Sequence, residues 1–321
     1  MKMLVIGGAG YIGSHVAREF LDAGHQVCVF DNLSSGTREN LFPEADFVEG
    51  DILDQAALSH VFSQGFDGIV HLAALKDPGG SMQMPDLYAE NNITGTINIL
   101  NAALKANVLS IVFSSSASVY GAPQYIPIDE EHPTNPESFY GFTKLTIDHL
   151  LQWFDRITDI RYASLRYFNA CGYDMQGRIK GIEKNSTNLL PRIMEVAVGR
   201  SRAIEIYGND YPDTIDGTCV RDYIHVNDLA TAHILALEYI VKHRKSLVVN
   251  LGSEKGYSVA EMVEAVRAIT GQPIPVIQAG RRPGDPSISI ASSKKALEVL
   301  GWSPRYSELE NIVKSMWEVY Q

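Results

Sequence analysis

Tyr140 and Lys144 stand four residues apart in the stretch "SFYGFTKL" at 138–145. On a helix, residues i and i+4 are neighbours on one face, so the two side chains can act on one object. An ammonium group beside a phenol favours the phenolate, which makes Tyr140 a candidate proton acceptor near neutral pH. Because the chain has 15 tyrosines, one such pair also arises easily by chance. Whether the Tyr140–Lys144 pair is catalytic depends on which other residues the fold places beside it.

A glycine-rich turn follows the first apolar run of the chain. The run "KMLVIGG" has strand character and leads through Gly7, Gly10 and Gly13 into a helical pattern over 11–23. Glycines there let the backbone approach a pyrophosphate, whose charge then lies at the helix N-terminus. Asp31 ends the second apolar run, 18 residues beyond Gly13, and is suitably placed to bind an adenosine ribose. No Arg or Lys directly follows Asp31, which favours NAD over NADP.

Three serines end the apolar run "SIVFSSS", and the last of them, Ser116, lies 24 residues before Tyr140. In an open parallel sheet, ligands gather at the carboxyl ends of the strands. We therefore expect Ser114, Ser116 and the start of the Tyr140 helix beside the nicotinamide. One hydroxyl would bind a substrate oxygen while Tyr140 removes its proton. Lys144 and the cationic nicotinamide would lower the Tyr140 pKa from ~10 to ~7, about 4 kcal/mol. A polar turn with a packed tyrosine remains the alternative.

Strand-like apolar runs alternate with helical patterns along the first half of the chain. This alternation predicts a parallel sheet covered by helices on both faces, the Rossmann-type doubly wound α/β arrangement. The two longest helices are expected at about 85–107 and 136–154. The six runs with strand character are "KMLVIGG", "QVCVFDN", "DFVEGDI", "GIVHLAA", "SIVFSSS" and "RYASLRYFN".

The pattern loosens after about Cys171, where Gly, Pro and Asp separate shorter elements. We expect an NAD-binding domain over 1–170 and a smaller, mixed α/β substrate-binding domain over 171–217 and 253–321. The stretch "VRDYIHVNDLATAHILALEYI" again has the pattern of a strand followed by a helix. Segments around 218–252 are therefore expected to return to the main sheet.

Composition narrows the class of protein. Hydrophobic residues make up 45% of the 321 residues, which suits a globular core, and no apolar run reaches the ~18 residues that span a bilayer. The short apolar run at the N-terminus does not resemble a signal peptide. Cys28, Cys171 and Cys219 are an odd number without metal-like spacing, which indicates reduced thiols, a cytoplasmic protein and no metal site. The net charge of −11 argues against nucleic acid as a partner, and an anionic substrate would need a local group of arginines.

Several blocks of the sequence resemble known enzymes. The glycine-rich turn, Asp31, "GDI" at 50–52, "HLAALK" at 71–76, "FSSSASVYG" at 113–121 and the Tyr140–Lys144 pair resemble the extended short-chain dehydrogenase/reductases. Within that family, "LRYFNACG" at 165–172, "YGNDYPDTIDGTCVRDYIHVNDLA" at 207–230 and "RRPGD" at 281–285 are similar to the UDP-glucose 4-epimerases. The resemblance covers nearly the whole chain.

The resemblance implies roles for residues that match the family's motifs. Ser116, Tyr140 and Lys144 would be catalytic. NAD would be held by Tyr11, Ile12, Asp31, Asn32, Asp51, Ile52, Ala73, Lys76 and Asn91, with Phe168 near the nicotinamide. The nucleotide-sugar would be held by Asn169, Asn188, Leu189, Tyr207, Arg221, Arg282 and Asp285. The residue types agree, because guanidinium groups match phosphate oxygens bidentately.

The implied reaction is epimerisation at C4 of UDP-hexoses, interconverting UDP-glucose and UDP-galactose through a 4-keto intermediate. NAD would stay tightly bound and be regenerated in each turnover. The resemblance also suggests a homodimer built from the two longest helices, for which Ile147, Leu150, Leu151 and Phe154 offer an apolar face. Packing of these residues against their own sheet is the alternative. The small Ser289, beside the sugar's C2 substituent in similar enzymes, predicts that UDP-GlcNAc and UDP-GalNAc are accepted too.

One loop departs from the family pattern. Residues 77–81 read Asp-Pro-Gly-Gly-Ser, where the family usually has a small apolar residue, Gly and an acidic residue before the Ser. Pro78 and Gly80 leave the contacts of this loop open.

The alternatives to this function are another 4-epimerase, a dehydratase or decarboxylase, and a non-catalytic dinucleotide sensor. A 4-epimerase of UDP-glucuronate or UDP-xylose is the nearest alternative. A nucleotide-sugar dehydratase or decarboxylase would need an acidic residue just after the serines, where this chain has Ala117-Ser118-Val119. A non-catalytic dinucleotide sensor would have no use for the Ser116, Tyr140 and Lys144 set.

Overall fold

The structure is a computed structural model, and it describes residues 1–183, 186–282 and 284–321. The chain divides into two compact units. Unit 1 consists of Met1–Gly121, Thr134–Tyr167 and Ala230–Val249, and unit 2 of Ala122–Pro133, Phe168–Leu229 and Asn250–Gln321. The expected boundary at 170 lies three residues beyond the end of the second segment of unit 1. The structure differs in assigning 122–133 to unit 2 and in returning only 230–249 to unit 1.

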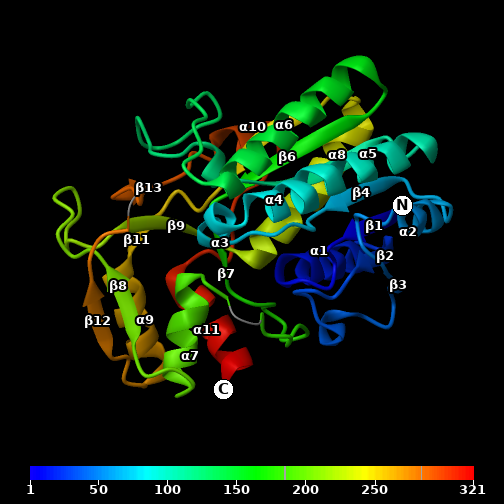
Figure 1. Cartoon of the computed structure of the whole chain (residues 1–321). Helices are drawn as coiled ribbons and strands as arrows, with labels where there is room; N and C mark the ends of the chain where they lie inside the picture. The colour runs from blue at the N-terminus through cyan, green and yellow to red at the C-terminus, as the bar shows by residue number, and fades with distance from the viewer. Residues whose placement is uncertain (184–185, 283) are drawn as a thin grey trace. The chain divides into compact units, whose positions relative to one another are not determined.

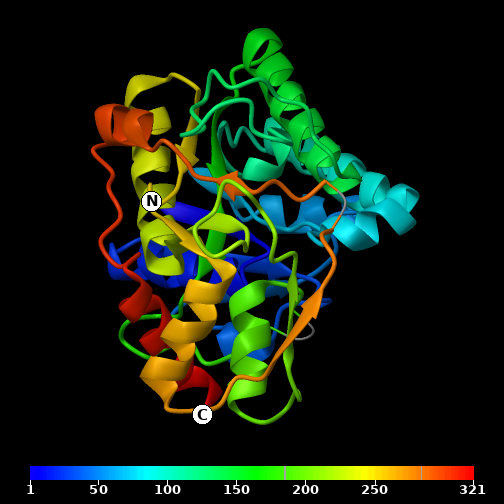
Figure 2. The same ribbon diagram turned by 90° about the vertical axis from the view of Figure 1, so that its left-hand side faces the viewer.

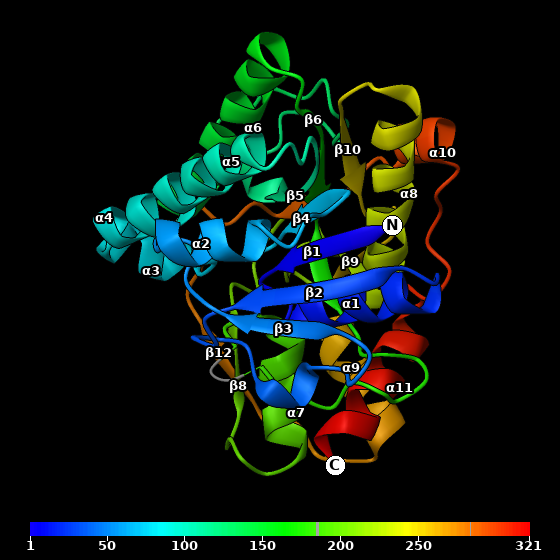
Figure 3. The same ribbon diagram turned by 90° about the vertical axis from the view of Figure 1, so that its right-hand side faces the viewer.

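Unit 1 is built on one seven-stranded sheet with the order β10-β6-β5-β4-β1-β2-β3 (Figure 3). Its strands β1, β2 and β3 lie side by side in Figure 1. The pairs formed by β1 with β2 and β4, by β2 with β3, and by β5 with β4 and β6 are all parallel. All six predicted strand runs belong to this sheet, which confirms the fold class. The strands are β1 (Lys2–Ile6), β2 (Gln26–Asp31), β3 (Asp46–Glu49), β4 (Gly68–His71), β5 (Ser110–Ser116), β6 (Arg161–Tyr167) and β10 (Leu247–Leu251).

Helices cover both faces of this sheet, with α2, α5 and α6 on one side and α1 and α8 on the other (Figure 3). The cause is amphipathic spacing: Val16 and Phe20 of α1, and Ile147 and Leu151 of α6, are fully buried one turn apart. The helical segments are α1 (Tyr11–Asp22), η1 (Arg38–Asn40), α2 (Gln55–Phe62), α3 (Pro78–Gln83), α4 (Pro85–Tyr88), η2 (Ala89–Thr94), α5 (Gly95–Lys105), η3 (Ala117–Val119), α6 (Phe139–Ile157) and α8 (Val226–His243).

The two long predicted helices form with altered details. The first runs without a break through α4, η2 and α5, and η2 is a π-helical stretch, a feature that is frequent at functional sites. The second, α6, begins at Phe139 rather than at Pro136, because the Ser138 hydroxyl accepts the Gly141 N–H at 3.1 Å and caps the helix there.

Unit 2 contains a mixed sheet centred on β9. Strand β9 pairs antiparallel with β11 and parallel with β7 and β13, while β8 and β12 form a separate parallel pair. Helices α7, α9 and α11 pack against one another, and α7 and α9 lie beside β8 and β12 (Figure 2). The elements are β7 (Asn169–Cys171), α7 (Leu189–Ala197), β8 (Ile204–Tyr207), β9 (Val220–His225), β11 (Gly256–Ser258), α9 (Val259–Thr270), β12 (Val276–Ala279), β13 (Ile288–Ser289), α10 (Lys294–Leu300) and α11 (Leu309–Tyr320).

The predicted return of β9 to the main sheet is wrong. The chain instead returns through α8 and β10, and β9 stays in unit 2. A buried carboxylate accounts for this: Asp222 accepts hydrogen bonds from the backbone N–H groups of Ser253 at 2.7 Å, Glu254 at 3.1 Å and Ala291 at 3.1 Å. These bonds tie β9 to distant loops of unit 2, and neither loop is recognisable from the local pattern of β9.

Candidate active site

The glycine-rich turn of unit 1 is closely packed against the end of β4. Gly7 has φ +84°, a conformation that favours glycine, and a Cβ there would lie 2.6 Å from the Ala73 backbone N. A Cβ on Gly13 would lie 2.0 Å from the Gly7 carbonyl oxygen. Gly10 is the N-cap of α1 and supplies no side-chain cap. The turn therefore presents backbone and the start of α1, as a phosphate cradle requires.

Asp31 lies at the carboxyl end of β2, beside this turn. Its buried carboxylate accepts the N–H of Ala9 at 2.9 Å and the N–H of Leu33 at 2.8 Å. Burial raises the pKa of Asp31, and these two hydrogen bonds oppose that rise. A carboxylate has about four acceptor positions, so capacity for ribose hydroxyls remains.

Asn32, Asp51 and Ile52 follow the ends of β2 and β3. The Asn32 amide donates to the Asp51 carboxylate at 2.8 Å, and the same carboxylate caps the Leu53 N–H at 2.8 Å. Ile52 is buried in the apolar core, and its carbonyl accepts the Asn98 amide at 3.1 Å. The structure thus brings the two polar residues together and places Ile52 beneath them.

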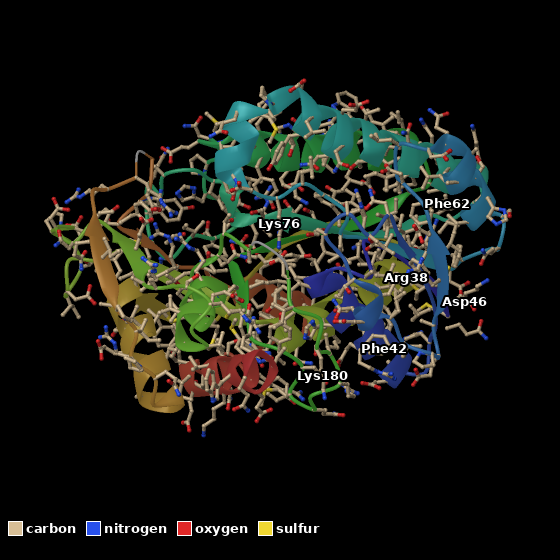
Figure 4. The ribbon with its side chains drawn as sticks, turned by 60° about the horizontal axis from the view of Figure 1, so that its bottom comes forward. Arg38, Phe42, Asp46, Phe62, Lys76 and Lys180 are labelled. Atoms are coloured by element: carbon tan, nitrogen blue, oxygen red, sulfur yellow. The ribbon has the colours of Figure 1, made fainter. Side chains whose placement is uncertain are left out.

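A hydrogen-bond hub centred on Asn92 lies among the predicted residues Ala73, Lys76 and Asn91. Asn92 was not predicted from the sequence. Buried Asn92 accepts the Leu75 N–H at 2.8 Å and donates to the Leu75 carbonyl at 2.9 Å. Asn91 donates to Asn92 at 2.9 Å. Lys76 lies in the segment that leads from β4 to α3 (Figure 4). The hub therefore fixes the loop that carries Ala73 and Lys76.

The hydrogen bonds of this hub extend to α6, the helix that carries the candidate base Tyr140. The Asn92 amide also donates to the Thr143 hydroxyl at 3.1 Å, and Thr143 donates to the Tyr140 carbonyl at 2.7 Å. Two adjacent asparagines inside a helical stretch, Asn91 and Asn92, were the available sequence signal, because asparagine is a poor helix former.

Tyr140 and Ser116 meet as predicted. Their hydroxyl groups are hydrogen-bonded to each other. Ser116 ends β5, and its hydroxyl also accepts the Ser118 N–H at 3.1 Å, which fixes its rotamer at the start of η3. Lys144 donates to the Ser114 carbonyl at 2.6 Å, and its Nζ lies 4.8 Å from the Phe113 ring centroid.

Burial is the largest influence on the pKa values of Tyr140 and Lys144. Burial raises the pKa of Tyr140 to about 12, although the hydrogen bond from Ser116 lowers it. Burial lowers the pKa of Lys144 to about 7, and the Asp148 carboxylate raises it. Desolvation of the phenolate therefore opposes the lowering of the Tyr140 pKa that is predicted from Lys144 together with the cationic nicotinamide. An activated Tyr140 therefore needs a further positive charge.

Residues 77–81, treated above as a loop, form the start of α3. Asp77 caps this helix by accepting the N–H groups of Gly79 at 3.2 Å and Gly80 at 3.1 Å. The buried Ser81 hydroxyl accepts the backbone N–H of Tyr140 at 2.9 Å. Ser81 was not singled out from the sequence, and it positions the backbone of the candidate base.

In unit 2, Arg221 lies on β9 and forms an ion pair with Asp285. Ser289 on β13 is the register partner of Arg221 in the parallel β9–β13 pair. These three predicted residues, which are up to 68 positions apart (Arg221 to Ser289), are therefore neighbours. The Arg221 side chain is 15% exposed.

A second arginine group lies at the ends of β8 and β12. The Arg282 guanidinium lies 3.8 Å from the Tyr207 ring centroid, and that of Arg281 lies 4.3 Å from the Tyr211 ring centroid. Stacking of this kind holds the planar group, and Arg281 also forms an ion pair with Asp210 at 2.7 Å. Pro283, in the same block, lies outside the described residues.

The remaining predicted residues lie on other elements of unit 2. Asn169 on β7 donates to the Asp222 carbonyl at 2.9 Å. Asn188 is the N-cap of α7 without a side-chain cap bond, and Leu189 is its first residue. Phe168 is buried, and its N–H donates to the Leu251 carbonyl at 3.1 Å.

Three further features bear on the class of protein. All three cysteines are buried and free. Within 1–183, 186–282 and 284–321, no group of three or more His, Cys, Asp or Glu residues is arranged to hold a metal ion. In the same described ranges, no helix has the length and apolar character needed to cross a membrane.

The parallel sheet, the glycine-rich turn and the Ser116, Tyr140 and Lys144 set define a Rossmann-type α/β protein with the side chains of a dehydrogenase-like site. The model of the NAD dependent epimerase/dehydratase family matches residues 3–252. The chain belongs to this family.

Individual relatives are similar over their full length. The UDP-glucose 4-epimerase of Lacticaseibacillus casei is 45% identical, with 100% of this chain and 97% of that protein covered. The UDP-glucose-4-epimerase structure from Stenotrophomonas maltophila, with bound NAD and formylated UDP-arabinopyranose, has a TM-score of 0.95 and 38% identity, covering 100% and 98% of the two chains. The UDP-Glc/GlcNAc 4-epimerase of Campylobacter jejuni has a TM-score of 0.87 and 38% identity, covering 99% and 98%.

Proposed function

We propose that this protein catalyses the NAD-dependent epimerisation of UDP-hexoses at C4, interconverting UDP-glucose and UDP-galactose. The observation that carries the proposal is the hydrogen-bonded Ser116–Tyr140 pair with Lys144 one turn along α6. It lies at the carboxyl end of β5, the edge at which ligands of such sheets bind. Full-length similarity to UDP-glucose 4-epimerases supports the choice of reaction.

The residues of unit 1 fit NAD. Close packing at Gly7 and Gly13 leaves no room for side chains, so a pyrophosphate can approach the backbone, and Asp31 can accept ribose hydroxyls. The residues that would hold NAD are Gly7, Gly10, Tyr11, Ile12, Gly13, Asp31, Asn32, Asp51, Ile52, Ala73, Lys76, Asn91, Ser114, Tyr140, Lys144 and Phe168. When bound, NAD accepts a hydride from the sugar and returns it, and its nicotinamide supplies a positive charge.

Tyr140 removes the proton from the sugar C4 hydroxyl and later returns it. Ser116 holds the same oxygen through its hydroxyl. Lys144 stabilises the phenolate that forms. The anchoring of Tyr140 from two sides, at its N–H by Ser81 and at its carbonyl by Thr143, keeps the base in place during proton transfer.

Unit 2 supplies the cations that an acidic protein needs to bind an anionic substrate. Arg221 and Arg282 would bind the UDP phosphates, because guanidinium groups match phosphate oxygens bidentately. Asp285 orients Arg221 through their ion pair. Asn169, Asn188, Leu189 and Tyr207 would complete the nucleotide-sugar contacts, with the start of α7 favouring negative charge.

One assay tests the reaction. Purified protein is incubated with UDP-galactose without added NAD, and UDP-glucose is measured. Formation of UDP-glucose is expected, because NAD is proposed to remain bound. No conversion, with or without added NAD, would reject the proposal. Parallel incubations with UDP-glucuronate and UDP-xylose compare the two alternative epimerase activities.

Substrate breadth is proposed from Ser289. Its small side chain, beside Arg221 in the β9–β13 register, leaves room for an acetamido group at C2. We expect kcat/KM for UDP-GalNAc within about 10³ of that for UDP-galactose, which is a difference below ~4 kcal/mol. Ser289→Tyr should lose activity on the acetylated sugar selectively. If Ser289→Tyr retains it, Ser289 does not line this space.

A homodimer is proposed through the outer face of α6. The face named from the sequence is wrong in part, because Ile147, Leu151 and Phe154 pack against unit 1's own core. The exposed apolar residues of α6 are Phe142 (47%), Trp153 (58%) and Ile157 (71%). Light scattering should give about twice the 35.4 kDa chain mass. A monomer at micromolar concentration would reject the dimer, and Trp153→Glu should weaken it.

The cytoplasm is the proposed location. The buried free thiols of Cys28, Cys171 and Cys219 support a reducing compartment, where such thiols persist. Cell fractionation tests this, and recovery outside the cytoplasmic fraction would contradict it.

A further inference from the structure

Lys144 is a buried cation whose charge has to be maintained by its surroundings. Lys144 is 2% exposed, and its Nζ contacts the Ser114 carbonyl and the ring faces of Phe113 and Tyr140. A carbonyl and two rings are neutral, so none of them compensates the cost of burying an ammonium group. A buried ammonium group in such surroundings needs a negative charge nearby.

The next turn of α6 carries that charge. Asp148 follows Lys144 by four residues, which places both on one face of the helix. The Asp148 side chain is fully buried. It therefore acts on Lys144 through a poorly screened interior rather than through water.

Asp148 is held by two strands of the sheet. Its carboxylate accepts the Ser164 hydroxyl at 2.5 Å and the Ser115 hydroxyl at 3.3 Å. It also forms an ion pair with the Arg166 guanidinium. It accepts a hydrogen bond from Arg166 Nε at 3.1 Å and lies 3.0 Å from Nη2. Arg166 in turn donates to the Tyr120 phenol at 3.0 Å. These bonds hold the carboxylate in one orientation.

We propose that Asp148 is a positioning residue that maintains Lys144 as an ammonium ion through the charge of its carboxylate. The inference deepens the proposed function, on which it rests for its catalytic meaning. Asp148 does not touch substrate in this proposal, and it acts through Lys144.

The electrostatics of the cluster agree with this role. Burial lowers the pKa of Lys144 to about 7, and Asp148 is the group that raises it. On β4, His71 faces Lys144 but stays neutral, because burial and Lys144 lower the His71 pKa to about 3. The His71 ring is fixed by a 2.9 Å hydrogen bond between its Nε2 and the Thr96 hydroxyl.

The other titratable groups around the pair do not replace Asp148. Tyr140 on α6 and Tyr167 on β6 are buried phenols whose pKa is raised, so they stay neutral. Tyr88 of α4 also faces Tyr140, and its pKa is raised as well. Arg166 on β6 is a cation that pairs with Asp148. Asp148 is therefore the anion that acts on Lys144 among these groups.

The test compares two variants of the cluster. Asp148→Asn keeps the shape and removes the charge, whereas Ser164→Ala removes the shortest hydrogen bond to Asp148 and keeps the charge. The holoenzyme is labelled with ¹³C at lysine Cε, and Lys144 is assigned from the signal that disappears in Lys144→Met. Its titration midpoint is then measured by NMR, together with kcat at pH 7.

We expect Asp148→Asn to lower the Lys144 midpoint by about one pH unit and kcat at pH 7 about fivefold, because a midpoint that moves from about 7 to about 6 reduces the ammonium fraction from about one half to about one tenth. Ser164→Ala should move the midpoint by less than ~0.3 unit. Because Asp148→Asn leaves Arg166 buried without its partner, Asp148→Asn combined with Arg166→Met provides the same test without an unpaired charge.

An unchanged Lys144 midpoint in both Asp148 variants would overturn the proposal, and so would an equal shift in Ser164→Ala. The NMR titration does not depend on turnover. A wild-type protein without epimerase activity would therefore reject the proposed function while the midpoints still decide the role of Asp148.

Discussion

Lys144 in unit 1 and Arg221 in unit 2 are both cations of a proposed site, and their surroundings differ. Lys144 is 2% exposed, and burial brings its pKa to about 7. Arg221 is 15% exposed and paired with the Asp285 carboxylate. A guanidinium keeps its charge in either environment, whereas a lysine amine responds to burial. The residue type in each unit thus matches the work proposed for it.

The difference extends to the neighbours. Around Tyr140 the partners are short side chains, Ser81, Ser116 and Thr143, which fix the base through several hydrogen bonds. Around Arg282 the partner is an aromatic face. We infer that unit 1 is built for fixed geometry and tuned protonation, and unit 2 for binding a permanent anion. Chemistry and affinity should then be separable by mutation.

Tyr140→Phe should give the largest effect. Removing the hydroxyl removes the base, so kcat should fall at least about 10³-fold, or ~4 kcal/mol. NAD content and thermal stability should stay near wild type, because one buried hydroxyl contributes only ~1 kcal/mol. Tyr239→Phe on α8 is the matched control and should retain activity. Near-normal turnover of Tyr140→Phe would show that another group is the base.

Arg221→Gln should act mainly on affinity. Loss of a bidentate phosphate contact should lower kcat/KM about 100-fold through a higher KM, which corresponds to ~3 kcal/mol. Arg200→Gln, which removes an exposed partner of Glu195, serves as the control and should change little. Should Arg221→Gln instead lower kcat at saturating substrate with KM unchanged, the proposed division of labour between the units would be wrong.

Ser81→Ala and Ser138→Ala separate positioning from capping. Both hydroxyls accept N–H groups in the first turn of α6, so each loss should cost ~1 kcal/mol of stability. Only Ser81 holds the N–H of Tyr140 itself, so only Ser81→Ala should also lower kcat, by about tenfold. Denaturant unfolding and steady-state kinetics measure the two effects. Equal kcat losses in both variants would mean that kcat depends on the capping of α6 and not on the hydrogen bond from the Tyr140 N–H to Ser81.

The smallest expected effect is on stability as a function of pH. Lys144 titrates at about 7 in the folded protein, whereas an unfolded lysine titrates near ~10.4. Between these values the unfolded chain binds more protons, so stability rises with pH. From pH 7 to 8 the wild type should gain about 1 kcal/mol relative to Lys144→Met. Urea unfolding at both pH values measures this difference, and a constant difference would contradict the proposed burial cost.

Much of unit 1 is determined locally by the sequence. Apolar runs of strand character, the helical pattern over 11–23 and the glycine-rich turn before it each act over a few residues, and these elements formed as predicted. The meeting of Ser116 and Tyr140 also follows, because parallel strands end at one edge of the sheet. Such features depend on periodicity and backbone geometry, which a short stretch of sequence contains.

Tertiary structure decided what depends on burial and on distant partners. The pKa of Tyr140 is raised rather than lowered, because the sequence shows that a lysine is near and does not show how much water is excluded. Asp148 and Ser81 acquire their roles only when β6 and α3 pack against α6. The apolar face of α6 containing Ile147 turned inward, because a helix pattern shows that a face is apolar and only packing shows what covers it.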